Sequence, residues 1–281
     1  MRKLLIDLFG LDRLYKIRKS RVVNYLPRLR QATRAYNYRY GQILRWSVDS
    51  REDTNYTYAL TDDSLLYLAH TVAVVSGVSP ATVQAYFREV QTDDALRDYV
   101  LEKTRTSSYK RVADLRVEFG RRLGWYALVR IMKPGVVIET GVDKGLGAVL
   151  LCSALLRNRA EGSPGRYYGT DIAPKAGYLL DGIYKEVGQV LYGDSITSLK
   201  AFDQPIDLFI NDSDHSATYE LEEYKVVLPK LTPNGVLLSD NAHVASSLAQ
   251  LSLEVGRKFV YYPEVPKDHW YPGAGIGFSF L

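Results

Sequence analysis

The 281 residues of the chain are 46% hydrophobic and 24% charged, a balance that permits a buried core and is typical of a folded protein. Their number accommodates one sizeable α/β domain with an appendage, or two small domains. No run of about 18 apolar residues occurs, so the sequence predicts no membrane-spanning helix. The single cysteine, Cys152, excludes an internal disulfide, which agrees with the cytoplasmic location that we predict.

Charge is distributed unevenly along the chain. Residues 1–45 hold twelve Lys or Arg and two Asp, a net charge of +10, which leaves −6 on the remainder. Leucines in the first 15 residues recur at helical spacing, which predicts an amphipathic basic helix, or two helices broken at Gly10. Asp7 and Asp12 interrupt the apolar run, so we predict no export signal. Three possibilities stay open for this arm: packing on the body or on a second subunit of a homo-oligomer, peripheral contact with an anionic membrane or a polyanionic partner, and disorder.

The segment from residue 61 to 130 is helical in pattern. Three start signals stand at Thr61, at Ser79-Pro80 and at Thr92-Asp93-Asp94, where short polar side chains can cap a helix. The breaker Lys133-Pro134-Gly135 ends this pattern. We therefore predict a helical N-terminal region over residues 1–133, followed by a second domain over 134–281.

After residue 134 short apolar runs alternate with helical stretches, as in a parallel sheet built from βαβ units. The last two runs have no clear helix between them and predict a closing antiparallel hairpin. Helices are expected near 145–158, 175–185, 195–201, 217–230 and 243–256. The predicted strands are Val136–Glu139, Arg166–Ile172, Gln189–Tyr192, Ile206–Asn211, Val236–Ser239, Lys258–Tyr262 and Gly275–Phe280.

A glycine-rich turn follows the first predicted strand. It begins Glu139-Thr140-Gly141 and continues to Gly145 and Gly147, so its glycines are spaced Gly-x-x-x-Gly-x-Gly. Glycine lets the backbone approach a ligand at the carboxyl end of a strand. A dinucleotide site would require Gly-x-Gly-x-x-Gly, and the acid before the first glycine disfavours a phosphate. A carboxylate instead suits a ligand with an ammonium and a sulfonium group.

This stretch resembles the first motif of the class I Rossmann-like methyltransferases that depend on S-adenosylmethionine. The order of strands and helices over residues 134–281 resembles the fold of the same class. The resemblance implies an α/β fold with a mostly parallel seven-stranded sheet, and S-adenosylmethionine as cofactor. It implies that Glu139, Thr140, Gly141, Gly145 and Gly147 lie at the amino-acid part of the cofactor.

Two further strand ends fit a nucleoside. Asp171 ends the second strand, where a carboxylate can accept both ribose hydroxyls. Gly193, Asp194 and Ser195 follow the third strand, and in similar enzymes this loop borders the adenine. The alternative for Asp171 and Asp194 is that each only caps the helix that follows it.

The fourth and fifth strands deliver oxygen ligands to the same edge of the sheet. Asp212 and Asp214 follow the fourth strand, and Asp240-Asn241 follow the fifth, which makes a set suited to Mg²⁺. The spacing resembles the metal-dependent O-methyltransferases of the catechol, caffeoyl-CoA and macrolide-sugar types. By that resemblance Asp212, Asp240 and Asn241 hold Mg²⁺ or another divalent cation, which lowers the pKa of a substrate hydroxyl. The alternative is that these acids cap the following helices.

A proton acceptor is the remaining requirement. Catechol-type enzymes have a lysine three residues after the first metal Asp, and His215 stands there in this chain. We expect Asp212 and His215 to be catalytic, with His215 as the first candidate base and His243 as the second. A metal-free mechanism in which His215 alone deprotonates the substrate is the alternative.

Two other functions compete with methylation of a small-molecule hydroxyl: methylation of a nucleic-acid base amine, and a non-catalytic or hydroxylase-type role. Enzymes that methylate base amines of nucleic acids resemble one another in an Asn or Asp followed by Pro-Pro and an aromatic residue, and this chain reads Asn211-Asp212-Ser213-Asp214 there. A non-catalytic or hydroxylase-type relative shares the metal pattern and stays open. The aromatic residues near the C-terminus can stack on a sugar or a phenol, and a saccharide is weakly preferred: Tyr261, Tyr262, Trp270 and Tyr271.

Overall fold

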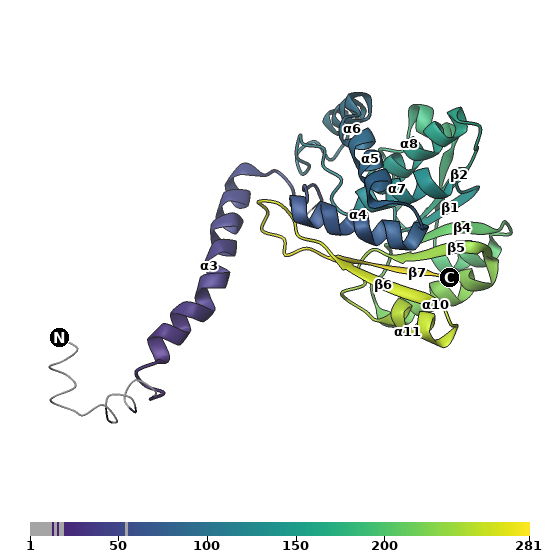
Figure 1. The fold of residues 1–281 in the computed structure, drawn as a ribbon. Coiled ribbons are helices and arrows are strands. Elements are labelled where there is room, and N and C mark those ends of the chain that lie inside the picture. The colour runs from purple at the N-terminus through teal and green to yellow at the C-terminus, as the bar shows by residue number, and fades with distance from the viewer. Residues whose placement is uncertain (1–12, 14–15, 17–19, 54–55) are drawn as a thin grey trace. The chain divides into compact units, whose positions relative to one another are not determined.

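A computed structural model describes residues 13, 16, 20–53 and 56–281 (Figure 1). The predicted helix in the first 15 residues therefore lies outside the described residues. The chain divides into two compact units. One holds the described residues up to Ser50 with Asp268–Trp270, and the other holds Arg51–Lys267 with Tyr271–Leu281. The predicted division at residue 133 stays a prediction.

The smaller unit is built on one long helix, α3 (Tyr25–Asp49). Near its end, the rings of Trp46 and Trp270 lie 5.3 Å apart between centroids. Most of the large apolar side chains of α3 are exposed, and its only acidic residue is Asp49. The helix is therefore basic and presents apolar surface to solvent.

The larger unit begins with three helices that start where the sequence predicted. Thr61, Ser79 and Asp93 each accept a hydrogen bond from a backbone N–H in the first turn of α4, α5 and α6. These caps satisfy donors that have no partner within the helix. The helices of this region are α4 (Asp62–Ser76), α5 (Pro80–Gln91), α6 (Asp94–Thr106) and α7 (Arg122–Met132).

Seven strands form one sheet in the order β3-β2-β1-β4-β5-β7-β6. The first five are parallel, and β7 runs antiparallel to both β5 and β6. This confirms the predicted α/β class, the mostly parallel sheet and the terminal antiparallel strands. The strands are β1 (Val136–Thr140), β2 (Arg166–Asp171), β3 (Gly188–Tyr192), β4 (Ile206–Asn211), β5 (Leu231–Ser239), β6 (Lys258–Pro263) and β7 (Gly275–Phe280).

Helices cover both faces of the sheet (Figure 1). Val137 of β1 packs with the core that includes α4, α5, α7 and α8 (Leu146–Ala160), whereas Val136 and Ile138 face the opposite core. The second core includes α9 (Ser195–Ala201), α10 (Ala217–Val227) and α11 (Ser247–Glu254). Successive strand residues point to opposite faces, so a central strand covered on both sides reads as an unbroken apolar run.

Some predicted boundaries are wrong. The helix expected at 175–185 is only a 3₁₀ turn, η1 (Gly182–Glu186), because Gly177 and Gly182 adopt positive φ angles that a helix does not accommodate. The N-terminal helical pattern is also broken by turns between α6 and α7. The helix expected from 243 begins at Ser247, and residues 228–230 leave α10 for a short 3₁₀ turn, η2.

Among the described helices, none alone is long and apolar enough to cross a membrane. Only α4 and α5 taken together, bent by 118°, meet that criterion of length and composition.

Candidate active site

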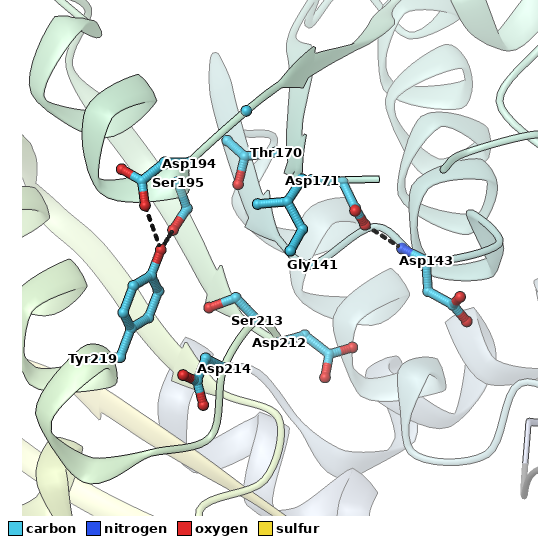
Figure 2. A pocket seen from close by; sticks show the side chains of 12 residues that line it. Gly141, Asp143, Thr170, Asp171, Asp194, Ser195, Asp212, Ser213, Asp214 and Tyr219 are labelled. Carbon is cyan, nitrogen blue, oxygen red and sulfur yellow. Dashed lines mark hydrogen bonds between the residues drawn. The ribbon is translucent and has the colours of Figure 1, made fainter. Parts of the chain in front are cut away.

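A pocket of about 680 Å³ opens at the carboxyl ends of the parallel strands (Figure 2). This is the usual ligand position in open α/β sheets. Five aspartates contribute to its wall, and none of the described lysines or arginines does. The lining residues are Gly141, Asp143, Thr170, Asp171, Ile172, Gly193, Asp194, Ser195, Asp212, Ser213, Asp214 and Tyr219. Such a wall favours a cationic ligand over a phosphate.

The turn after β1 brings two strand ends into close contact. Gly141 has a φ of +84°, and a Cβ placed there would lie 2.0 Å from the carbonyl oxygen of Asp212. Gly145, with a φ of +92°, precedes the first residue of α8. The glycine spacing is thus required by backbone conformation and by the approach of β4 to β1.

Glu139 lies behind the pocket rather than on its wall. Its side chain is buried, and the hydroxyl of Tyr167 donates to its Oε2 at 2.6 Å. A Cβ at Gly147 would lie 2.4 Å from Glu139 Oε1, so glycine leaves room for this carboxyl. Burial raises the pKa of Glu139 to about 8.

Asp171 and Asp194 stand at opposite sides of the pocket (Figure 2). Asp171 accepts backbone hydrogen bonds from Asp143 at 2.9 Å and from Ala173 at 2.8 Å. The next described helical element after Asp171 is η1, which begins only at Gly182, so Asp171 caps no helix. Asp194 does cap α9, accepting from the backbone N–H of Thr197 at 2.7 Å. Asp194 thus combines capping with a place on the pocket wall.

A buried glutamate ties three strand ends together beneath the pocket. Glu223 of α10 accepts hydrogen bonds from the hydroxyls of Thr140, Ser195 and Ser213, and from the side-chain amide of Asn211. Ser213 Oγ lies 3.0 Å from both carboxyl oxygens. Burial raises the pKa of Glu223 to about 7. Two of these donors line the pocket, so Glu223 fixes the wall from below.

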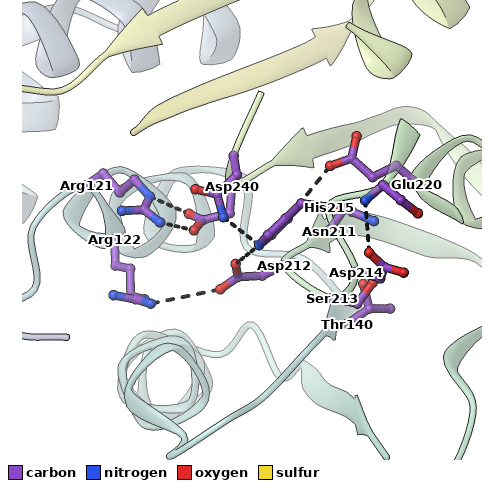
Figure 3. Close-up of polar contacts among 12 residues, drawn as sticks. Arg121, Arg122, Thr140, Asn211, Asp212, Ser213, Asp214, His215, Glu220 and Asp240 are labelled. Atoms are coloured by element: carbon purple, nitrogen blue, oxygen red, sulfur yellow. Dashed lines mark hydrogen bonds and ion pairs between the residues drawn. The ribbon is translucent and has the colours of Figure 1, made fainter. Parts of the chain in front are cut away.

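The two carboxylates predicted to bind metal each face an arginine (Figure 3). Asp240 is fully buried and accepts from both Nε and Nη2 of Arg121, with Nε–Oδ1 at 2.7 Å. Arg122 Nη2 lies 3.9 Å from Asp212 Oδ2. Burial and the charge of Asp240 raise the pKa of Asp212. Burial opposes ionisation of Asp240 as well, but Arg121 holds its pKa below the usual value.

This arrangement does not fit a divalent cation. Both oxygens of Asp240 are occupied by a guanidinium, and a second guanidinium stands at Asp212. The amide nitrogen of Asn241 lies 2.7 Å from His215 Nε2. Among the residues that the structure describes, no three His, Cys, Asp or Glu side chains are grouped to hold a metal ion. A metal ion would compete with Arg121 for the oxygens of Asp240.

His215 lies between the pocket and a buried acid. Its Nε2 is 3.8 Å from Asp212 Oδ1, and its Nδ1 is 3.8 Å from Oε1 of Glu220 (Figure 3). Glu220 is fully buried, and neither of its oxygens has a hydrogen-bond partner in the described part of the chain. Burial and the charge of Arg121 lower the pKa of His243, the second candidate base.

Sequence reasoning missed several residues of this region. Arg121 and Arg122 precede the predicted catalytic domain, and no local pattern pairs them with acids about 100 residues later. Glu220 and Glu223 were read only as part of a helix, although their spacing of three places both on one helix face. Tyr219 precedes Glu220, and its hydroxyl donates to Asp194 at 2.9 Å.

Comparison with known proteins agrees with the fold. Residues 138–242 match the family described as "Methyltransferase domain". The structure is similar to an O-methyltransferase from Bacillus cereus in complex with SAH, with a TM-score of 0.51 and 15% identity, over 68% of this chain and 91% of that one. It is also similar to the O-methyltransferase TomG from Streptomyces achromogenes in complex with SAM, with a TM-score of 0.50 and 15% identity, over 67% and 90%.

A putative O-methyltransferase from Klebsiella pneumoniae is similar too, with a TM-score of 0.50 and 13% identity, over 72% of this chain and 96% of that one. No curated protein matches the sequence. The structural likenesses show the fold, and the family match lies on the strands that carry the pocket. The structural likenesses confirm the Rossmann-like α/β fold that the resemblance implied, and residues 138–242 match a methyltransferase domain.

Proposed function

We propose that this domain transfers the methyl group of S-adenosylmethionine to a hydroxyl oxygen of a small molecule, with His215 accepting the proton. The observation that carries the proposal is the pocket wall, which holds five aspartates and, among the residues that the structure describes, no lysine or arginine. A sulfonium nucleoside with an ammonium group gains from such a wall, whereas a dinucleotide or a nucleic-acid phosphate is repelled. This also disfavours the nucleic-acid alternative.

Residues at the strand ends would hold the cofactor. Asp171 would accept the ribose hydroxyls, and the loop from Gly193 to Ser195 would border the adenine, because both line the pocket. Gly141 brings backbone to the amino-acid part, with Glu139 behind it. When bound, S-adenosylmethionine supplies an electrophilic methyl group. Asp171 and Gly141 would orient it toward the acceptor.

The acceptor hydroxyl must lose its proton to become nucleophilic. Asn241 can donate its amide hydrogen to Nε2 of His215, which leaves the Nδ1 hydrogen facing Glu220. In that tautomer the lone pair of Nε2 lies on the side of Asp212. An acceptor hydroxyl that took the place of the Asn241 amide would give its proton to this nitrogen. Glu220 would stabilise the imidazolium that results.

The finer expectations from sequence stay proposals. A cation at Asp212, Asp240 and Asn241 would compete with the Arg121–Asp240 pair, so we derive the mechanism without the magnesium ion. A saccharide acceptor and a homo-oligomer stay predictions. A non-catalytic or hydroxylase-type role would be favoured if the protein bound cofactor but methylated no acceptor in a panel of saccharides and catechols.

We further propose that α3 contacts an anionic membrane surface. The helix carries five arginines and no acid before Asp49, and most of its large apolar side chains are exposed. A basic helix with exposed apolar residues is suited to the boundary of a bilayer with anionic headgroups.

Isothermal titration with S-adenosylhomocysteine and with NAD tests the cofactor. We expect micromolar affinity for the first and no heat from the second, because the acidic wall repels a pyrophosphate. Asp171→Ala should weaken the binding of S-adenosylhomocysteine, whereas Asp203→Ala, away from the pocket, should leave it unchanged. Binding of NAD without any response to S-adenosylhomocysteine would contradict the proposal.

A further inference from the structure

We infer that the guanidinium groups of Arg121 and Arg122 take the place of the divalent cation that the sequence predicts, with Arg122 stabilising the acceptor oxygen. The inference rests on the proposed methyl transfer and adds a catalytic residue to it. Both arginines stand at the start of α7 and reach the ends of β4 and β5 (Figure 3).

Arg121 is a fixed structural cation. Its side chain is 7% exposed, and it pairs with two carboxylates that are themselves fully buried, Asp240 and Glu264. Arg121 Nη1 lies 2.9 Å from Glu264 Oε1 and also donates to the hydroxyl of Tyr58. A metal ion on Asp240 would leave a buried guanidinium without its bidentate partner, which is strongly unfavourable. A divalent cation on Asp240 would therefore have to compete with a buried ion pair for the same carboxylate.

The guanidinium of Arg122 is not held by a short ion pair. Its side chain is 15% exposed, and its closest carboxylate oxygen is Asp212 Oδ2 at 3.9 Å, beyond hydrogen-bond distance. Its Nε is buried and has no hydrogen-bond partner among the described residues. The guanidinium lies 5.4 Å from the ring centre of Trp125, which helps to fix its position. A largely buried guanidinium whose nearest described carboxylate lies 3.9 Å away is suited to receive an oxyanion.

The place of Arg122 relates it to the reacting atoms. Asp212 is on the pocket wall and has Arg122 at 3.9 Å from one carboxyl oxygen and His215 at 3.8 Å from the other. An acceptor hydroxyl beside Asp212 thus has a base and a cation within reach. These are the two elements that a metal-dependent site obtains from its ion and its base.

The reaction balances without a metal. The acceptor O–H bond breaks, and its proton goes to His215 Nε2. The oxygen then forms a bond to the methyl carbon as the carbon–sulfur bond breaks, and that electron pair stays on sulfur, which becomes a neutral thioether. Arg122 donates charge-assisted hydrogen bonds to the oxygen while it carries negative charge. The proton on His215 leaves to water after the transfer.

Manganese binding tests the replacement directly. The full chain, saturated with S-adenosylhomocysteine, is titrated with Mn²⁺ and the free ion is read by electron paramagnetic resonance. We expect no stoichiometric binding. One Mn²⁺ per chain in the wild type, lost in Asp240→Asn, would overturn the inference. The binding of S-adenosylhomocysteine in the same samples tests the proposed function separately, because it does not depend on the ion.

A chromophoric phenol tests the role of Arg122. In excess chelator, 4-nitrocatechol is added to the complex with S-adenosylhomocysteine, and its phenolate absorbance is followed at a pH where the free probe is mostly protonated. We expect the wild type to bind the phenolate and Arg122→Gln to lose about tenfold or more in affinity. Arg122→Lys, which keeps the charge, should retain part of it.

Arg159→Gln is the matched control, because Arg159 pairs with Glu186 at 2.8 Å on the surface. It should bind the probe like the wild type. Four results would overturn the role of Arg122: no phenolate binding by the wild type, equal binding by Arg122→Gln, a phenolate signal that chelator abolishes, or loss of S-adenosylhomocysteine binding in Arg122→Lys. The last would assign the guanidinium to the cofactor instead of the acceptor.

Discussion

Glu223 shows how one buried side chain can organise a pocket that it does not line. Its carboxyl joins the ends of β1 and β4 to the first residue of α9 through Thr140, Ser213 and Ser195. Four donors converge on two oxygens, which satisfies most of the acceptor capacity of an ionised carboxylate. Burial nevertheless penalises the charge, and the donors only partly offset that penalty.

This balance predicts a pH-dependent stability. The pKa of Glu223 is raised from 4.5 to about 7, so the native chain keeps a proton that the unfolded chain loses. The contribution of Glu223 is therefore largest below pH 4.5 and decreases as the pH rises to about 7. Relative to Glu223→Gln, the wild type should lose free energy of unfolding over this window, measured by urea denaturation at several pH values.

Glu254→Gln, which removes an exposed glutamate, is the control for the loss of one carboxyl. Its difference from the wild type should vary little over the same range. A difference between wild type and Glu223→Gln that stayed flat, or grew with pH, would show that the buried carboxyl is ionised throughout.

At the scale of elements, the junction between β1 and β4 sets the geometry of the pocket. Gly141 and Gly162 have nearly the same positive φ angle, +84° and +87°. A Cβ at Gly141 meets the carbonyl of Asp212, whereas a Cβ at Gly162 has nothing within 4 Å. The two positions therefore separate conformational strain from steric overlap.

Alanine substitution at both glycines uses this difference. Gly162→Ala should cost about 1–2 kcal/mol of unfolding free energy, because an L-residue is strained at positive φ. Gly141→Ala should cost about 1–3 kcal/mol more, because β4 must move away from β1. Denaturation and calorimetry with S-adenosylhomocysteine measure both effects, and only Gly141→Ala should weaken binding. Equal destabilisation by the two substitutions would mean that the strand ends adjust freely.

Elements were predictable where the pattern was local. The strand ranges 206–211 and 275–280 and the helix 195–201 were predicted to the residue, because apolar runs and the cap Asp194 mark them in the sequence. The helix expected at 175–185 failed because two glycines in positive φ conformations outweigh its apolar spacing.

At the scale of the whole molecule, the site combines segments that are distant in sequence. The turn after β1, the acidic strand ends and His215 all followed from reading residues 134–281 in order. The arginine partners did not, since they lie on the N-terminal side of the predicted domain boundary and meet Asp212 and Asp240 only through folding. A sequence that shows two carboxylates does not show which cation neutralises them.

The basic arm gives the last prediction, which concerns how the whole molecule meets a surface. In α3, Arg30, Arg34 and Arg45 share one side of the helix at 3.6 residues per turn, next to exposed apolar residues such as Leu26 and Leu44. The full chain should therefore sediment with anionic vesicles and much less with neutral ones, and added salt should weaken the binding. Replacing the three arginines with glutamine should lower the affinity by about a hundredfold, at about 1 kcal/mol per charge.

A chain lacking residues 1–20 separates α3 from the preceding segment, and Arg159→Gln controls for the loss of a cation elsewhere. Equal sedimentation with both vesicle types, together with a dimer in analytical ultracentrifugation that the triple variant abolishes, would instead assign α3 to a contact between two copies of the chain.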